Sequence, residues 1–274
     1  FGKIDRSLID KVNFRLPEDG SFTKQLKPAL EQPKLFLGGE RWGRKEWVGI
    51  IYPAKTKETD FLDHYIRNFN GIELNSTHYQ VYPAATIRKW AEKAAGTDFK
   101  FCPKFPQSIS HYSDLSSAKA HADTDRFLDS ILNFGTHLGP LFLQLSEKFG
   151  PQRSGALFSY LQKLPQDIDV TLEVRHPDWF ANTEARNELF GVLNELGVGA
   201  VITDVSGRRD CVHMEVTSPA TFIRFVGNGL HPTDYERMDD WVKRIKSWLQ
   251  KDIREIHLYM HQPDELYTPQ LTDY

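Results

Sequence analysis

Strand and helix patterns alternate along most of this 274-residue chain, and this alternation limits its fold more than any other feature. Eight short apolar segments resemble buried strands, and segments with helical periodicity separate most of them. The expected strands are 34–38, 71–77, 99–105, 140–146, 169–175, 199–204, 221–227 and 255–261. Strands that alternate with helices form βαβ units and a parallel sheet. Eight such units in roughly 250 residues predict an α/β fold with a single (β/α)₈ TIM-like barrel.

Both ends of the chain depart from this repeat. Residues 1–33 have no strand pattern, and the sequence predicts that they form an N-terminal extension packing on a barrel domain, 34–274. The extension is expected to fill the place of the eighth helix or to cover the bottom of the barrel, since the chain after 261 allows only a missing or minimal eighth helix. The alternative is an open doubly wound sheet, but no Gly-x-Gly-x-x-Gly motif opens the first helix.

Composition excludes several classes of protein. A net charge of −3, with 40% apolar and 26% charged residues, is typical of an ordinary globular chain and gives no general reason to bind nucleic acid. Only two cysteines are present, Cys102 and Cys211, which is too few for a disulfide framework or a cysteine zinc site. No apolar stretch reaches the length of a membrane span. We therefore expect a cytoplasmic protein without a membrane partner.

Polar side chains occupy positions where a barrel would have an apolar core. Strands buried on both faces are normally near-continuous apolar runs. Here ionisable or amide groups recur near the carboxyl ends of the strands, where barrel enzymes place their catalytic residues. These groups are Glu73, Asn75, Lys104, Gln144, Glu173, Arg175, Asp204 and Arg224. Because unpaired buried charges are unfavourable, they must pair with one another or with a ligand. A purely structural network that fixes strand register is the alternative.

The charged residues suggest roles in catalysis and in binding. Glu73 with Glu173 or Asp204 is a candidate acid/base pair, as glycoside hydrolysis requires. Lys104 beside the arginines is expected to have a lowered pKa and to act as a base or an imine-forming amine, unless it forms a salt bridge with Glu73. The arginines offer forks for a phosphate or carboxylate group.

Residues in the loops after the strands add further candidates. Trp42 and Trp179 are expected either to stack on a substrate ring or to anchor their loops. His176 is a further candidate binding residue, and with Glu173 and Asp204 it has the ligand types of a divalent metal site. The nearby arginines oppose a cation, so neither a metal nor another cofactor is predicted. His111 is a candidate acid or base.

Several short motifs in order resemble the domain-of-unknown-function 72 family. They include Trp42–Pro53 (WGRKEWVGIIYP), Phe69–Tyr79 (FNGIELNSTHY), Phe101–His111 (FCPKFPQSISH), Leu138–Leu145 (LGPLFLQL) and Glu173–Phe180 (EVRHPDWF), followed by Thr203-Asp204 and Ile223–Phe225. This resemblance implies a TIM-like barrel with a polar pocket at the strand ends, and it implies no established reaction.

This chain differs from the family pattern at three places. The first strand ends in Gly38–Trp42 (GGERW), where the family usually has Gly-Thr-Ser-Gly-Trp. His78 stands where Phe is usual, and Met260–Gln262 (MHQ) stands where the last strand usually ends in asparagines. The resemblance therefore implies a pocket that accepts a different substrate.

Three functional hypotheses follow from these residues. The first is a non-redox hydrolase, lyase or isomerase acting on a small anionic or sugar-like molecule. The second is a nucleic-acid or nucleotide-binding module with arginines on phosphate and tryptophans on bases. Carboxylates in the pocket disfavour a polyanion, so the enzyme is preferred over nucleic acid. The third is a barrel that serves only as a scaffold.

Overall fold

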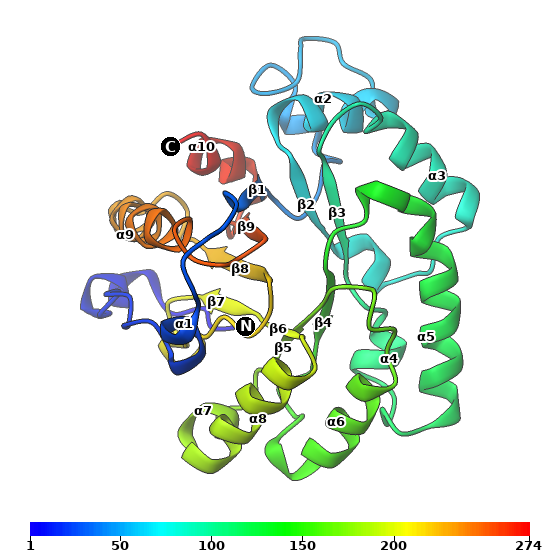
Figure 1. Ribbon diagram of the computed structural model, residues 1–274. Coiled ribbons are helices and arrows are strands. Elements are labelled where there is room, and N and C mark those ends of the chain that lie inside the picture. The colour runs from blue at the N-terminus through cyan, green and yellow to red at the C-terminus, as the bar shows by residue number, and fades with distance from the viewer.

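The computed structural model describes residues 1–274 as a mixed α/β fold with parallel strands (Figure 1). The strands are β1 (Lys34–Gly38), β2 (Gly71–Leu74), β3 (Lys100–Pro103), β4 (Leu141–Gln144), β5 (Val170–Glu173), β6 (Gly199–Ala200), β7 (Ile202–Asp204), β8 (Ala220–Val226) and β9 (Glu255–His261). They pair in three sheets, in the orders β1-β9-β8-β7, β2-β3 and β4-β5-β6. Every pair of adjacent strands is parallel, as the alternation of strands and helices predicts.

The pairing does not form the single closed sheet that a complete barrel requires. The expected strand 199–204 is interrupted at Val201, so β6 and β7 belong to different sheets. The gaps between sheets are crossed by isolated backbone hydrogen bonds, such as Glu73 N to Gly39 O (3.1 Å) and Phe105 N to Phe142 O (2.9 Å). Most strands are short, and β2 ends at Leu74 where the chain turns into a 3₁₀-helix. Such short strands have too few backbone N–H and C=O groups to continue the hydrogen bonding from one sheet to the next.

The helices surround the strands, which lie toward the middle of the molecule (Figure 1). They are α1 (Ser21–Gln25), α2 (Phe61–Asn68), α3 (Ala84–Lys93), α4 (Gln107–Ser110), α5 (Ala118–Ile131), α6 (Ser154–Gln162), α7 (Asp178–Ala181), α8 (Thr183–Glu195), α9 (Pro232–Trp248) and α10 (Thr268–Asp273). The helix after the last strand, α10, has only six residues. Helices that are both long enough and apolar enough to traverse a bilayer are absent from the structure.

The apolar core has an outer and an inner part. Two clusters of 37 and 16 buried residues pack the strands against the helices and the N-terminal segment. A smaller inner cluster contains Cys102, Phe142, Val201, Phe222 and Tyr259. The rings of Phe142 and Phe222 stack there with their centroids 5.1 Å apart. These inner side chains form an apolar layer beneath the polar strand ends.

The N-terminal segment packs beside the connection between β7 and β8. This connection contains a 3₁₀-helix but no α-helix, and Glu215 accepts hydrogen bonds from the backbone N–H groups of Ser21 and Phe22, both at 3.0 Å. Asp19 pairs with Arg244 of α9 at 2.7 Å. The segment therefore covers the side of the fold where the helix between β7 and β8 would lie, and its residues 27–29 also pair with the chain just before β9.

Candidate functional site

Arg224 links two strand ends of the candidate site by ionic hydrogen bonds. From β8, its Nε and Nη2 donate to the two carboxylate oxygens of Glu73 on β2, at 2.8 and 3.1 Å. Its Nη1 donates to Oε2 of Glu173 on β5, at 3.1 Å. All three side chains are buried. A guanidinium fork is suited to this arrangement, because it can engage two carboxylates at fixed angles.

Both carboxylates of this network are held in their charged form. Burial opposes ionisation, but Arg224 and His261 outweigh it and keep the pKa of Glu73 well below its usual range. Arg175 donates from Nε to Oε1 of Glu173 at 2.7 Å, and together with Arg224 it lowers the pKa of Glu173 despite the burial. An acid/base pair requires two carboxyls with well-separated pKa values. Near neutral pH Glu73 and Glu173 are therefore charged groups that hold the cations of the site in place. Neither is suited to donate a proton.

Lys104 differs from the arginines of this site because it has no carboxylate partner. It follows β3 directly and is 8% exposed, and its Nζ donates to Oε1 of Gln144 at 2.8 Å. No carboxylate lies within ion-pair distance of this Nζ, so the salt bridge to Glu73 considered from the sequence is not formed. Lys104 and Arg224 both lie over the ring of Phe142, at 5.4 and 5.1 Å from its centroid. Burial, followed by the charge of Arg224, lowers the pKa of Lys104 to about 8.

A hydrogen-bonded chain continues from Lys104 to two residues after β3. Nε2 of Gln144 lies 3.3 Å from Nε2 of His111, and Nδ1 of His111 lies 2.8 Å from Oγ of Ser110. Burial and the charge of Lys104 lower the pKa of His111, which keeps this ring neutral near pH 7. The structure thus places His111, a loop candidate in the sequence, next to the amide that holds Lys104.

Two residues of the site are absent from the candidate set that the sequence predicts. His261 at the end of β9 places Nε2 3.0 Å from Glu73 and Nδ1 3.2 Å from Glu40, which follows β1. Although burial disfavours the charged ring, Glu73 and Glu40 raise the pKa of His261 to about 9. His261 shares the inward face of β9 with Tyr259, so the alternation of side chains along a strand could have predicted its position. Glu40 lies in a loop that carried no comparable signal.

Glu40, His261 and Glu265 form the one group of three metal-type ligands whose donor atoms lie close together, within 4.8 Å of one another. Both ring nitrogens of His261 already face carboxylate oxygens, which favours the protonated ring over a metal. The set considered from the sequence, Glu173 with His176 and Asp204, does not assemble, because Asp204 belongs to another network.

His261 gives a pH dependence of stability that can be measured. The pKa of His261 in the folded protein, about 9, exceeds the ordinary histidine value of 6.5, so its contribution to stability is complete below pH 6.5 and is lost as the pH rises through 9. We expect the difference in unfolding free energy between the parent protein and His261→Asn to shrink by roughly 3 kcal/mol over this interval. Chemical denaturation at pH 6 and pH 10 measures it. A difference that does not change with pH would show that the folded ring is not charged.

A polar cavity of about 500 Å³ opens beside these strand ends. Its wall includes Arg41, Arg44, Arg175, Arg224 and His261 together with Glu40, Asp264 and Glu265. One buried donor on this wall, Nε2 of Gln262, has no hydrogen-bond acceptor in the protein. An unpaired buried donor is unfavourable, and an anion or a hydroxyl oxygen in the cavity would satisfy it.

Asp204 lies outside this site. Its side chain is fully buried, and it pairs with Arg209. The carboxylate also accepts hydrogen bonds from two residues of α9, Nη2 of Arg237 at 2.8 Å and Nε1 of Trp241 at 2.7 Å. Burial opposes its ionisation, but Arg237 and Arg209 lower the pKa of Asp204. This network joins β7 to α9 on the outer side of the strand, so the structure separates Asp204 from Glu73 and Glu173.

The loop residues proposed as substrate contacts have different positions. Trp179 is 0% exposed and its Nε1 donates to the carbonyl of Phe149 at 2.8 Å, so it anchors its loop and offers no face to a ligand. His176 lies 3.7 Å from Asp178 in the loop after β5 and lines none of the cavities described here. Trp42 is half-buried and lines a second, aromatic cavity together with Asn75.

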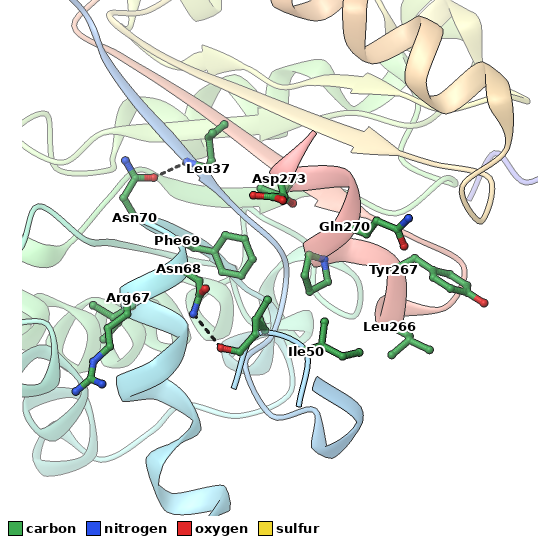
Figure 2. Close-up of a pocket in the computed structure, with 14 residues that line it drawn as sticks. Leu37, Ile50, Arg67, Asn68, Phe69, Asn70, Leu266, Tyr267, Gln270 and Asp273 are labelled. Atoms are coloured by element: carbon green, nitrogen blue, oxygen red, sulfur yellow. Dashed lines mark hydrogen bonds between the residues drawn. The ribbon is translucent and has the colours of Figure 1, made fainter. Parts of the chain in front are cut away.

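The largest cavity, about 960 Å³, lies away from this site (Figure 2). It is bordered by α2, β1 and α10, on the side where the last helix is short, and Ile50, Phe69, Leu266 and Tyr267 are among its lining residues. None of the candidate site residues lines it. Size alone therefore does not locate the chemistry of this protein.

The fold and this site define a mixed α/β protein with parallel sheets and a buried ionic network at its strand ends. Residues 36–274 match the model of the family described as protein of unknown function DUF72, and the chain belongs to this family. Two places where it differs from the family's pattern, Gly38–Trp42 and Met260–Gln262, meet in the structure through Glu40 and His261.

Relatives and solved structures agree with this assignment. The chain is 30% identical over 257 residues to the UPF0759 protein YecE of Escherichia coli (strain K12), covering 86% of this chain and 89% of YecE. It is 24% identical over 152 residues to the UPF0759 protein YunF of Bacillus subtilis (strain 168), covering 54% and 52%. A DUF72 family protein from Enterococcus faecalis V583 has a TM-score of 0.66 at 15% identity, covering 88% and 95%. A DUF72 family protein from Thermotoga maritima MSB8 has a TM-score of 0.63 at 18% sequence identity, and the match covers 88% of this chain and 98% of that protein.

Proposed function

We propose that this protein is a non-redox enzyme of the hydrolase, lyase or isomerase type that acts on a small anionic or sugar-like molecule at its strand ends. The observation that carries the proposal is the state of Lys104. Its amine is buried, has an amide as its polar partner and has a pKa lowered to about 8. A lysine in this state can remove a proton from a substrate or attack a carbonyl carbon, because a useful fraction is unprotonated near neutral pH.

The surroundings of Lys104 support an anionic substrate. Arg175 and Arg224 line the polar cavity, and Arg41 and Arg44, which also line it, add positive charge. Glu73 and Glu173 fix the guanidinium groups of Arg224 and Arg175. Held in this way, the arginines would orient the anionic group of a substrate while the amine reacts at a neighbouring carbon.

The proposal includes a barrel-type fold in which the three parallel sheets are parts of one ring of strands. The pairing of β1 with β9, the bond from Glu73 N to Gly39 O and the inner apolar layer around Phe142 support it. Barrel folds place catalytic side chains at the carboxyl ends of their strands. Glu73, Lys104, Glu173 and Arg224 all occupy such positions.

Reductive trapping tests the proposal without knowledge of the natural substrate. Pyridoxal 5′-phosphate is an anionic aldehyde whose imine with an amine is fixed by borohydride and located by mass spectrometry. We expect Lys104 to be labelled ahead of the surface lysines, with half-maximal labelling near its pKa of about 8. Lys104→Met should remove this label, while Lys100→Met, a change on the same strand, should leave it in place. Labelling of surface lysines alone would contradict the proposal.

A further inference from the structure

An aromatic cavity of about 390 Å³ adjoins the polar cavity. One side of it carries the rings of Trp42, Tyr79, Tyr82 and Trp90. Trp90 makes edge contacts with Trp42 and Tyr82, with centroid distances of 5.1 and 4.8 Å. Tyr79 is 73% exposed and the other three rings are half-buried, so all four keep surface available for contact. Large exposed aromatic surfaces that converge on one hollow are typical of ligand-binding sites.

The polar side of this cavity is shared with the candidate site. Glu40 and Arg41 line both cavities. Oε2 of Glu40 accepts from Nδ2 of Asn75 at 2.6 Å and also pairs with Nδ1 of His261 at 3.2 Å. Arg41 is about half-exposed and pairs with Glu40 at 3.1 Å. A ligand whose anionic group contacts the arginines of the polar cavity could therefore extend past Arg41 and reach the four rings.

Two polar atoms of the aromatic cavity lack partners in the protein. Oδ1 of Asn75 and Oγ of Ser76 are shielded from solvent and make no hydrogen bond. Both residues line the cavity. A buried polar atom without a partner is unfavourable, and a ligand that supplies N–H or O–H donors would satisfy both of these acceptors.

We infer that the aromatic cavity is a subsite for the ring of the substrate, a ring that carries N–H or O–H donors and is linked to the anionic group in the polar cavity. The inference rests on the proposed function, because that function supplies the anionic group. The aromatic side chains would pack against the face of the ring, and Asn75 and Ser76 would receive its donors. Ring and anion together would give a specificity that neither cavity has alone.

The tryptophans provide a direct readout for this subsite. The chain has six, and Trp47, Trp179, Trp241 and Trp248 are fully buried. Trp42 and Trp90 are the two with exposed surface, and both line the aromatic cavity. A ring bound there should therefore change the intrinsic fluorescence, whereas a small anion in the polar cavity should change it much less.

The experiment compares inorganic phosphate with glucose 6-phosphate and 4-hydroxyphenyl phosphate, two probes whose rings carry O–H donors, on the full chain. We expect at least one of the two ring-bearing phosphates to bind about tenfold more tightly than phosphate and to change the tryptophan fluorescence. Tyr79→Ala should remove most of this gain and leave phosphate binding unchanged, while Tyr274→Ala, at another exposed tyrosine, should change neither. A preference for one probe would identify the ring as carbohydrate or aromatic.

Three results would contradict different parts of these proposals. If phosphate binds in a manner that needs Arg175 but neither ring adds affinity or changes the fluorescence, the subsite is wrong and the proposed function stands. If ring affinity is gained equally in Tyr79→Ala and the parent protein, the ring binds elsewhere and the inference is also wrong. If no probe binds at all, the anionic substrate of the proposed function fails with it.

Discussion

Arg224→Met is expected to lower the free energy of unfolding by about 3–5 kcal/mol, because it leaves two buried carboxylates without their shared cation. Glu73 is 0% exposed and Glu173 is 2% exposed, and Arg224 contacts both. Urea denaturation of the variant and the parent protein measures the loss.

A matched control and a mutant cycle isolate this effect. Arg126 is 72% exposed, and its partner Asp123 keeps Lys119 as a second cation, so Arg126→Met should cost less than about 1 kcal/mol. The loss of unfolding free energy in the double variant Glu73→Gln with Arg224→Met should be clearly smaller than the sum of the losses in the two single variants, because the two side chains interact directly. If Arg224→Met cost no more than Arg126→Met, the ionic network described here would not exist in solution.

Lys104→Met is expected to raise stability at neutral pH and to abolish the chemistry that we propose. The pKa of Lys104 in the folded protein, about 8, lies below the ordinary lysine value of 10.5, so protonation of the buried amine opposes folding at every pH below 8. This cost falls as the pH rises from 8 to 10.5, where the unfolded chain binds more protons than the folded one. The stability advantage of the Met variant should therefore decrease by roughly 3 kcal/mol between pH 7 and pH 11.

Denaturation of Lys104→Met at both pH values, with Lys100→Met as the control, measures this difference. Lys100 donates to backbone carbonyls at the other end of β3 and should show no comparable dependence. Met has a similar length and no charge, so the variant tests the amine with little change in packing. A variant that is less stable at pH 7 than the parent protein would mean that the charged amine stabilises the fold.

The sequence predicted the parallel α/β arrangement because local periodicity marks each strand and helix. It did not predict the break at Val201 or the early end of β2 at Leu74, since both depend on backbone pairing between distant segments. The 3₁₀-helix at Asn75–His78 replaces the last part of an expected strand. Element positions were therefore more predictable than the continuity of the sheets.

Strand alternation also explains which site residues were found. Lys104 shares a face with Cys102 of the inner cluster, and Arg224 shares one with Phe222. Asp204 instead shares its face with Ile202, which packs in the cluster next to α9, so the same rule would have placed it outside the site. Glu40 was not predictable in this way, because loops have no fixed alternation.

A titration of the Lys104 amine, without and with phosphate, measures directly whether this lysine is a reactive amine beside an anion site. The NMR signal of its side-chain Cε can be assigned by its absence in Lys104→Met. We expect a pKa of about 8 without ligand, shifted upward by phosphate because a neighbouring anion favours the charged amine. A pKa of about 10.4, the value of an exposed lysine, that phosphate does not change would contradict it.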